Sequence, residues 1–221
     1  MNILRELKSY IAVNLNLPVL YSNDFFSQDG EDKIITKLFP KKNNGFYVDV
    51  GAHHPFRYSN TQTLHNKGWN GINIEPTPKD IILFFKTRKR DINIQTAVGK
   101  KTGSLTLYCF EDSALNTTSK IRAEKTINSK QSYLVDKVRV KVDTLENILD
   151  EHLQDNRIDF LNLDVEGNEL EVLRSNNWKR YSPTVIIVEN LNHTNTIPVY
   201  LKKRGYNLIE KTKMSEVYKL R

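Results

Sequence analysis

The sequence is poor in the residues that define several common classes of protein. It has one cysteine in 221 residues, Cys109, which excludes an internal disulfide and a zinc site made of cysteines. We expect Cys109 to fill a buried strand position. The 9 glycines and 7 prolines are too few for a largely disordered chain. No apolar run is long enough to span a bilayer or to form a cleavable signal, so the sequence predicts a cytoplasmic protein with no membrane span.

Length, apolar content and charge bound the remaining possibilities. With 38% apolar residues the chain can bury one sizeable core, which predicts a single domain over 1–221 with an N-terminal helical extension over 1–25. The formal charge of +7 favours anionic partners, and the basic residues are densest at 86–90 and 99–103. Nucleic acid and nucleotide-linked sugars are candidates, but the simplest interpretation of each basic run is a solvated surface.

Strand and helix signals alternate along most of the chain. Apolar runs predict strands at 45–50, 71–76, 92–98, 158–167 and 183–190, and helical spacing predicts helices at 27–39, 59–68, 78–90, 144–153 and 168–176. The last segment, 206–220, is predicted to form two strands around a turn. Between about residues 103 and 142 the apolar residues recur at every second position, which predicts an inserted hairpin or flap. The fold class is therefore α/β, with a mostly parallel seven-stranded sheet, helices on both faces and an antiparallel edge.

In such a sheet, ligands bind outside the carboxyl ends of the strands. The residues that follow the predicted strands form a rim of carboxylates on a basic protein. These strand-end residues are Asp49, Gly51, His53 and His54, then Glu75 and Pro76, then Ala97 and Val98, then Asp164 and Glu166, and finally Glu189 and Asn190.

The first two strand ends suggest an adenosine cofactor. Gly51 permits a sharp turn close to a ligand, and the helix that follows is expected to present free amides. Glu75 comes 24 residues later, at the interval typical of an acid that binds both ribose hydroxyls. Because the further glycines of a dinucleotide site are absent, S-adenosylmethionine, which has no phosphate, fits better than NAD. A structural turn followed by a solvent-facing acid is the alternative interpretation.

The chain also resembles a known family. The motifs are "SQDGEDKII", "FYVDVGAHHP", "SNT", "GWNGINIEP", "AVG", "VDTLENIL", "IDFLNLDVEGNELEVL" and "PTVIIVEN", in this order over residues 26–192. They are similar to those of FkbM-type S-adenosylmethionine-dependent methyltransferases. The resemblance implies a Rossmann-like class I methyltransferase fold and methyl transfer to oxygen, often on a sugar or glycan precursor. The residues it implies near the cofactor are Gln28, Asp49, Gly51, Asn60, Glu75, Pro76, Ala97, Val98 and Asp164.

Attack of an alcohol on a sulfonium methyl also requires a proton acceptor. The catalytic candidates are Asp164, His53, His54 and Glu189. In addition, the group Asp164, Glu189 and Asn190 resembles the magnesium site of catechol-type O-methyltransferases, and its oxygen ligands suit Mg²⁺ or Mn²⁺. Metal-free general-base catalysis is slightly favoured over this hypothesis. The histidines and acids would alternatively serve only as structural hydrogen-bonding groups.

Two further functions remain open at this point. One is an RNA ribose 2′-O-methyltransferase. Such enzymes usually have a lysine in the catalytic cleft, and no lysine is found at the end of a predicted strand, which argues against this function. The other is a noncatalytic binding module of the same fold. We predict a small-molecule acceptor, a sugar hydroxyl in a nucleotide-linked or glycan precursor. Acceptor choice is expected to lie in residues 1–25 and 111–136, which match no motif. The sequence leaves the oligomeric state open.

Overall fold

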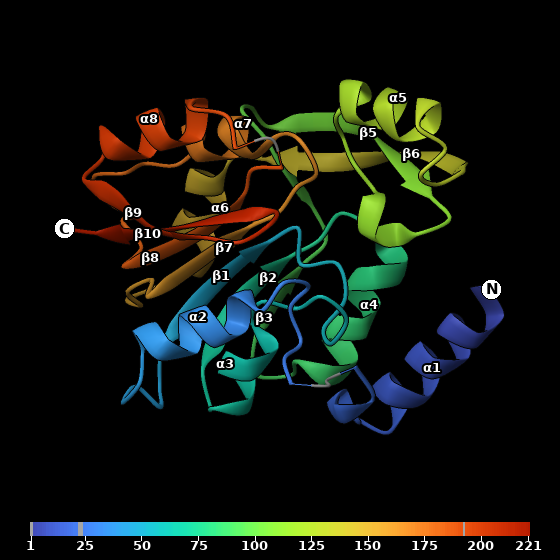
Figure 1. Ribbon diagram of the computed structural model, residues 1–221, viewed down its shortest axis with the longest axis horizontal. Helices are drawn as coiled ribbons and strands as arrows, with labels where there is room; N and C mark the ends of the chain where they lie inside the picture. The colour runs from blue at the N-terminus through green and yellow to red at the C-terminus, as the bar shows by residue number, and fades with distance from the viewer. Residues whose placement is uncertain (1, 22–23, 192) are drawn as a thin grey trace.

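The computed structural model describes residues 2–21, 24–191 and 193–221 (Figure 1). Its centre is a seven-stranded sheet with the order β3-β2-β1-β7-β8-β10-β9. The first five strands in this order run parallel, and β10 lies antiparallel to both β8 and β9. The strands are β1 (Phe46–Val50), β2 (Asn70–Ile74), β3 (Ile92–Ile94), β7 (Phe160–Leu163), β8 (Val185–Glu189), β9 (Tyr206–Lys211) and β10 (Ser215–Leu220). The predicted α/β class, with a mostly parallel sheet and an antiparallel edge, is confirmed.

Helices cover both faces of this sheet because side chains alternate along each parallel strand. On one face, Val48 and Val50 pack in a cluster with side chains of α6 (Leu145–His152), α7 (Glu169–Arg174) and α8 (Thr196–Lys202). On the other face, Tyr47 packs with side chains of α2 (Glu31–Leu38) and α3 (Gln62–Asn66). The helix α4 (Pro78–Thr87) lies on this second face, where the adjoining Arg88 donates a hydrogen bond to the Tyr47 hydroxyl.

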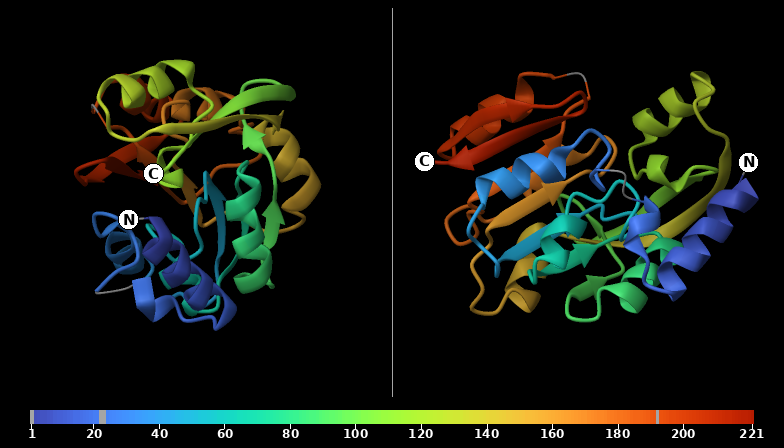
Figure 2. Two further views of the ribbon diagram at one scale, coloured as in Figure 1. Left: turned by 90° about the vertical axis from the view of Figure 1, so that its right-hand side faces the viewer. Right: turned by 60° about the horizontal axis from the view of Figure 1, so that its bottom comes forward.

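A smaller sheet stands beside the central one. It has the order β4-β6-β5 and consists of β4 (Ala97–Val98), β5 (Gly103–Phe110) and β6 (Leu134–Asp143). The segment between β5 and β6 contains η2 (Ser113–Leu115) and α5 (Lys120–Asn128). Figures 1 and 2 show this segment above the carboxyl ends of the parallel strands.

Four local predictions need correction. The strand expected over 92–98 is split, because the chain leaves the central sheet after Ile94 and Ala97–Val98 pair with β6 instead. The polar stretch between β5 and β6 contains the unpredicted α5, which is capped by the Ser119 hydroxyl. The helix expected from residue 27 begins at Glu31, since Gly30 before it has φ 85°. Cys109 is half-buried rather than buried.

The N-terminal residues form α1 (Asn2–Asn14) and η1 (Pro18–Tyr21), which pack against α4. Ala12 and Val13 of α1 are buried with Phe56, and Leu83 of α4 packs against the same cluster. The helix α8 was also not predicted. Within the described ranges, none of the helices combines the length and the apolar character needed to span a bilayer.

Candidate active site

A cavity of about 310 Å³ opens at the carboxyl ends of β1, β2, β7 and β8. This volume is within the range of small-molecule sites, about 300–1,000 Å³. Residues 112–118, from the segment after β5, form the opposite wall. The predicted residues that line the cavity are Gln28, Asp49, Gly51, His53, Asn60, Glu75, Pro76, Ala97, Val98, Asp164 and Glu189. The topology therefore brings most of the predicted strand-end residues to one place, whereas His54 and Asn190 do not line the cavity.

Gly51 lies where the chain after β1 packs closely against the chain after β7. It has φ 77°, and a side chain at this position would place its Cβ 1.7 Å from the Asp164 carbonyl oxygen. The Gly51 and Ala52 amides both donate to the Ile74 carbonyl, so neither is free for a ligand. The next helix, α3, does not begin until Gln62. The expected helix start with free amides directly after Gly51 is therefore absent from the described structure.

Glu75 is held rigidly by the backbone. The His53 amide donates to its Oε2 at 2.9 Å, and the Thr77 amide donates to its Oε1 at 2.7 Å. His53 has φ 52°, which orients this amide toward the carboxylate. Burial raises the pKa of Glu75, and the two amides oppose that rise. Each carboxylate oxygen retains a lone pair that can accept a further hydrogen bond from a ligand.

Asp49 is also fully partnered. Thr61 Oγ1 donates to one of its oxygens at 2.7 Å, and Asn162 Nδ2 donates to the other at 2.8 Å. Asn60 extends this network by donating to Asn162 Oδ1 at 2.8 Å. Gln28 reaches the cavity from the other side, where its amide lies 3.1 Å from the Met214 sulfur. These contacts fix the floor of the cavity with polar side chains.

The two histidines differ in position. His53 lines the cavity, with Nε2 3.1 Å from the Ser113 hydroxyl, and burial lowers the pKa of its imidazole to about 3, with a smaller contribution from Arg57. His54 is buried outside the cavity. Its Nδ1 accepts from the Phe56 and Arg57 amides, so the proton lies on Nε2 and faces the Ser9 hydroxyl at 2.8 Å. Because both ring nitrogens are used, His54 serves the packing of α1 and not the cavity.

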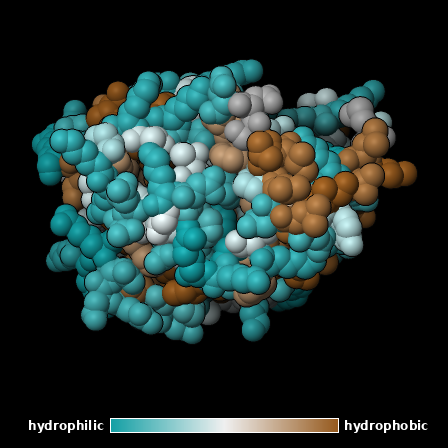
Figure 3. Space-filling model, turned by 90° about the horizontal axis from the view of Figure 1, so that it is seen from below, coloured by the Kyte–Doolittle hydropathy of each residue, from teal (hydrophilic) through white to brown (hydrophobic). Residues whose placement is uncertain are grey.

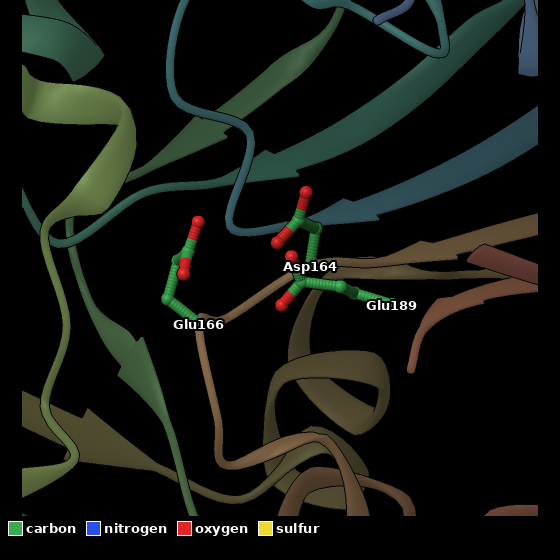
Figure 4. A group of neighbouring side chains, drawn as sticks. All are labelled: Asp164, Glu166 and Glu189. Carbon is green, nitrogen blue, oxygen red and sulfur yellow. The ribbon is translucent and has the colours of Figure 1, made fainter. Parts of the chain in front are cut away.

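Three carboxylates meet at the carboxyl ends of β7 and β8. One oxygen from each of Asp164, Glu166 and Glu189 lies within 4.8 Å of the others, and Figure 4 shows the three side chains turned toward a common space. We call this group the carboxylate cluster. Arg122 of α5 donates to Glu166 Oε2 from Nε at 2.9 Å and from the guanidinium terminus at 2.7 Å.

The other two members of the carboxylate cluster lack such partners. Glu189 is 4% exposed, and among the described residues nothing donates a hydrogen bond or ion pair to its carboxylate. Asp164 Oδ1 is buried without a hydrogen-bond partner in the same part of the chain. Burial, reinforced by Asp164 and Glu166, raises the pKa of Glu189 to about 11. Burial and Glu166 likewise raise the pKa of Asp164 well above its usual range.

Asn190 does not belong to the carboxylate cluster. Its Nδ2 donates to the Thr194 carbonyl and to Glu216 Oε2, both at 3.0 Å, and its Oδ1 accepts from the Thr194 amide. These bonds turn the side chain toward β10 and away from Asp164. Glu166 occupies the third position instead, because the chain turns after Val165 with φ 55° at Glu166.

Further residues of the cavity come from the segment between β5 and β6. Asp112 lines the wall and forms a two-bond pair with Arg57, with both distances 2.8 Å. Burial alone would raise the pKa of Asp112, but Arg57 lowers it to about 2. The sequence predicts that residues 1–25 and 111–136 determine acceptor choice, and it singles out no residue within them. The alternation of polar and small residues there gave no signal for Asp112 or Arg122.

The chain is similar to known methyltransferases in sequence and in fold. The family model described as "Methyltransferase FkbM domain" matches residues 49–208. The crystal structure of methyltransferase FkbM from Methylobacillus flagellatus KT has a TM-score of 0.54 and 14% identity, covering 96% of this chain and 54% of that one. This chain thus spans about half of that protein's length, and the likeness shows the fold alone. Precorrin-6y C5,15-methyltransferase from Geobacter metallireducens GS-15 matches at 10% identity with a TM-score of 0.41, covering 90% and 92% of the two chains. A search of curated proteins found no match.

Proposed function

The chain belongs to the FkbM methyltransferase family, and on that premise we propose that it is an S-adenosylmethionine-dependent O-methyltransferase. Its acceptor is a sugar hydroxyl in a nucleotide-linked or glycan precursor. The observation that carries the proposal is that one cavity contains both Glu75 and the carboxylate cluster. The Glu75 carboxylate is fixed by two backbone amides, and the cluster lies at the ends of the other strands.

The residues present fit the cofactor. Glu75 accepts hydrogen bonds from the ribose hydroxyls with the lone pairs that the His53 and Thr77 amides leave free. Pro76, Ala97 and Val98 form an apolar wall for the adenine. The unpartnered buried oxygen of Asp164 suits the positive charge of a sulfonium or ammonium group. When bound, S-adenosylmethionine supplies an electrophilic methyl group.

The carboxylate cluster provides the proton acceptor. Burial and Glu166 raise the pKa of both Asp164 and Glu189, so the two carboxyl groups titrate as a coupled pair. In this proposal Glu189 keeps its proton, and Asp164 is the ionised member that receives the proton of the acceptor hydroxyl. Arg122 neutralises Glu166 and keeps it oriented. His53 is a weaker candidate, because an imidazole with its pKa lowered to about 3 accepts protons poorly. Its role in the proposal is to position Glu75 through the backbone amide.

The same cluster also has the composition of a divalent-cation site. Asp164, Glu166 and Glu189 are hard oxygen ligands of the kind that Mg²⁺ and Mn²⁺ prefer. They replace the predicted set of Asp164, Glu189 and Asn190. A cation held there would lower the pKa of a neighbouring hydroxyl. Metal-free general-base catalysis remains the first proposal because Arg122 already pairs with Glu166.

The wall facing the cluster supports a sugar acceptor. The residues of the segment after β5 that line the cavity and carry hydroxyl or amide groups are Ser113, Asn116, Thr117 and Thr118. The Asn116 amide and the Thr117 hydroxyl already hydrogen-bond within the protein. Such groups bind neutral polyhydroxyl compounds by hydrogen bonds. A diphosphate would be repelled by the carboxylates, so it would lie outside the cluster. Among the described residues no lysine lines the cavity, which does not favour the RNA alternative.

The first test is a calorimetric titration with S-adenosylmethionine, with NAD as the control ligand, in the presence and absence of Mg²⁺ or Mn²⁺. We expect saturable binding of S-adenosylmethionine alone, followed by methylation of one member of a panel of nucleoside-diphosphate sugars. Tighter NAD binding, or no binding by a folded sample, would contradict the proposal. Methyl transfer that depends on added cation and is lost in Glu189→Gln but not in Asn190→Ala would select the metal mechanism.

A further inference from the structure

The helix α1 is apolar on two opposite sides. Its inner side packs through Ala12 and Val13 against Phe56, and Ser9 meets His54. The apolar residues exposed on its outer side, and in the turn and η1 that follow, are Ile3, Leu4, Leu7, Tyr10, Ile11, Leu15, Leu17, Val19 and Leu20. We call this set the outer face of α1. Figure 3 shows a hydrophobic area at one end of a face that is otherwise mostly hydrophilic in this view.

The exposure of this face is large for a folded monomer. Individual residues are exposed from 37% at Ile11 and Leu17 to 80% at Ile3. Soluble proteins seldom leave so many neighbouring apolar side chains in water unless the patch binds something. A helix with apolar residues along one exposed side and its axis along the protein surface has the form of an interfacial helix.

The charges around the outer face of α1 indicate an anionic partner. Glu6 is the single acidic residue among the first 23, and Lys8 is exposed on α1. On the neighbouring α4 and the loop after it, the exposed charged residues are all basic, namely Lys79, Lys86, Lys89 and Arg90. An apolar face on a helix that packs against the basic helix α4 matches a surface with acyl chains beneath negative headgroups. A second copy of the chain would instead bring these like charges together.

We propose that the outer face of α1 docks on an anionic membrane surface, with the apolar side chains in the headgroup boundary and the lysines of α1 and α4 against the phosphates. The helix is fixed to the rim of the cavity, since Arg5 pairs with Asp112 at 3.1 Å and Asp112 lines the cavity wall. Docking therefore holds the cavity beside the membrane. Access to membrane-borne acceptors is a consequence that rests on the proposed function, whereas docking itself does not.

The test is flotation of the full chain with vesicles of phosphatidylglycerol and phosphatidylcholine, and with vesicles of phosphatidylcholine alone. The variant is Leu4→Glu/Leu7→Glu, which changes two outward side chains. The matched control is Val199→Glu/Ile209→Glu, which adds the same charge at exposed apolar positions of α8 and β9. Near-ultraviolet circular dichroism verifies that each variant is folded.

We expect the wild type and the control to float with anionic vesicles, and less so at high salt. The Leu4→Glu/Leu7→Glu variant should partition at least about tenfold less, because each leucine loses its burial in the headgroup boundary. Absence of wild-type flotation, equal flotation with phosphatidylcholine alone, or an equal loss in the control would overturn the proposal. So would a dimer in sedimentation velocity that the variant abolishes, since it would assign the face to a second copy. Vesicle binding is read without methyl transfer, so its failure is distinct from failure of the proposed function.

Discussion

The two ends of the cavity bury the same chemical group in opposite ways. At the end formed by β1 and β2, both Glu75 oxygens accept backbone amides and both Asp49 oxygens accept side-chain donors. At the end formed by β7 and β8, Glu189 has no donor among the described residues and Asp164 Oδ1 has none either. Burying an unpartnered carboxylate costs free energy, so that end must hold a proton or a cationic ligand.

The cause of the pKa shift separates the two ends as well. Burial raises the pKa of both Glu75 and Glu189. At Glu75 hydrogen bonds from Thr77 and His53 oppose burial, whereas at Glu189 the neighbouring acids Asp164 and Glu166 add to it. The partnered end thus holds its carboxylates in one geometry, and the unpartnered end suits the proposed exchange of a proton or a cation.

The largest expected effect is on turnover at the unpartnered end. Asp164→Asn keeps the shape of the side chain but cannot accept the hydroxyl proton, so kcat should fall by about 10²- to 10⁴-fold. The affinity for S-adenosylmethionine should also fall, but by a smaller factor than kcat, because Asp164 is proposed to face the positive charge of the cofactor. Both are measured by methyl transfer to nucleoside-diphosphate sugars and by calorimetry, with Asn190→Ala as the control next to the cluster. Wild-type kcat in Asp164→Asn would remove Asp164 from the mechanism.

At the end formed by β1 and β2, a substitution should change the affinity for S-adenosylmethionine. Glu75→Ala removes the proposed acceptor for the ribose hydroxyls and should weaken S-adenosylmethionine binding by about 10- to 100-fold, the value of hydrogen bonds to a charged group. Calorimetry measures the dissociation constant, and Glu210→Ala, which removes an exposed glutamate of β9, is the control. If Glu75→Ala and Asp164→Asn both behaved as the wild type, the site itself would be misplaced.

The positions of the strand-end residues could be predicted better than the directions in which their side chains point. Continuous apolar runs identified the parallel strands, and the carboxyl ends of such strands meet at one edge whatever the side chains are. The direction of a side chain past the strand end depends on the turn. His53 and Glu166 have positive φ values, which turned His53 into the cavity wall, left His54 outside it and brought Glu166 to the cluster. No sequence pattern signals a positive φ at a histidine or a glutamate.

The polar segment between β5 and β6 was harder to predict than the sheet for a related reason. The helix α5 buries only Ala123 and Thr126, so it lacks the apolar periodicity by which helices are recognised. Its stability comes from the Ser119 cap and from tertiary contacts such as the Arg122 pair with Glu166. Such contacts between distant residues are absent from any local pattern.

A third prediction uses pH to compare the two ends. Glu189 has its pKa raised from 4.5 to about 11, so the folded protein holds a proton that the unfolded chain releases above pH 4.5. The free energy of unfolding should therefore fall with rising pH, by at most about 1.4 kcal/mol per pH unit from this group. Glu189→Gln removes this dependence and should be the more stable protein at pH 8, with little difference at low pH.

Urea unfolding at pH 5, 6.5 and 8 measures this difference, with the exposed Glu210→Gln as the control. Adding Mn²⁺ or S-adenosylmethionine should reduce the difference in the free energy of unfolding between Glu189→Gln and the wild type at pH 8. The reason is that a bound cation stabilises the ionised wild-type cluster and does not stabilise the glutamine variant equally. A gap that is constant with pH would mean that Glu189 is ionised in the folded state, and the contrast between the two ends would be lost.

The smallest expected effect concerns Asn190, the neighbour of Glu189, whose side-chain amide is fully hydrogen-bonded. Asn190→Ala removes the donor to the buried Glu216 and three hydrogen bonds with Thr194, so it should cost about 1–2 kcal/mol of stability at every pH. Glu216 retains Lys211 and Tyr218, which limits the loss. Urea unfolding should thus show opposite signs for adjacent residues at pH 8, destabilisation at 190 and stabilisation at 189, with kcat preserved in Asn190→Ala. A loss of kcat in Asn190→Ala beyond its loss of folded protein would return Asn190 to the site and make Glu216 part of it.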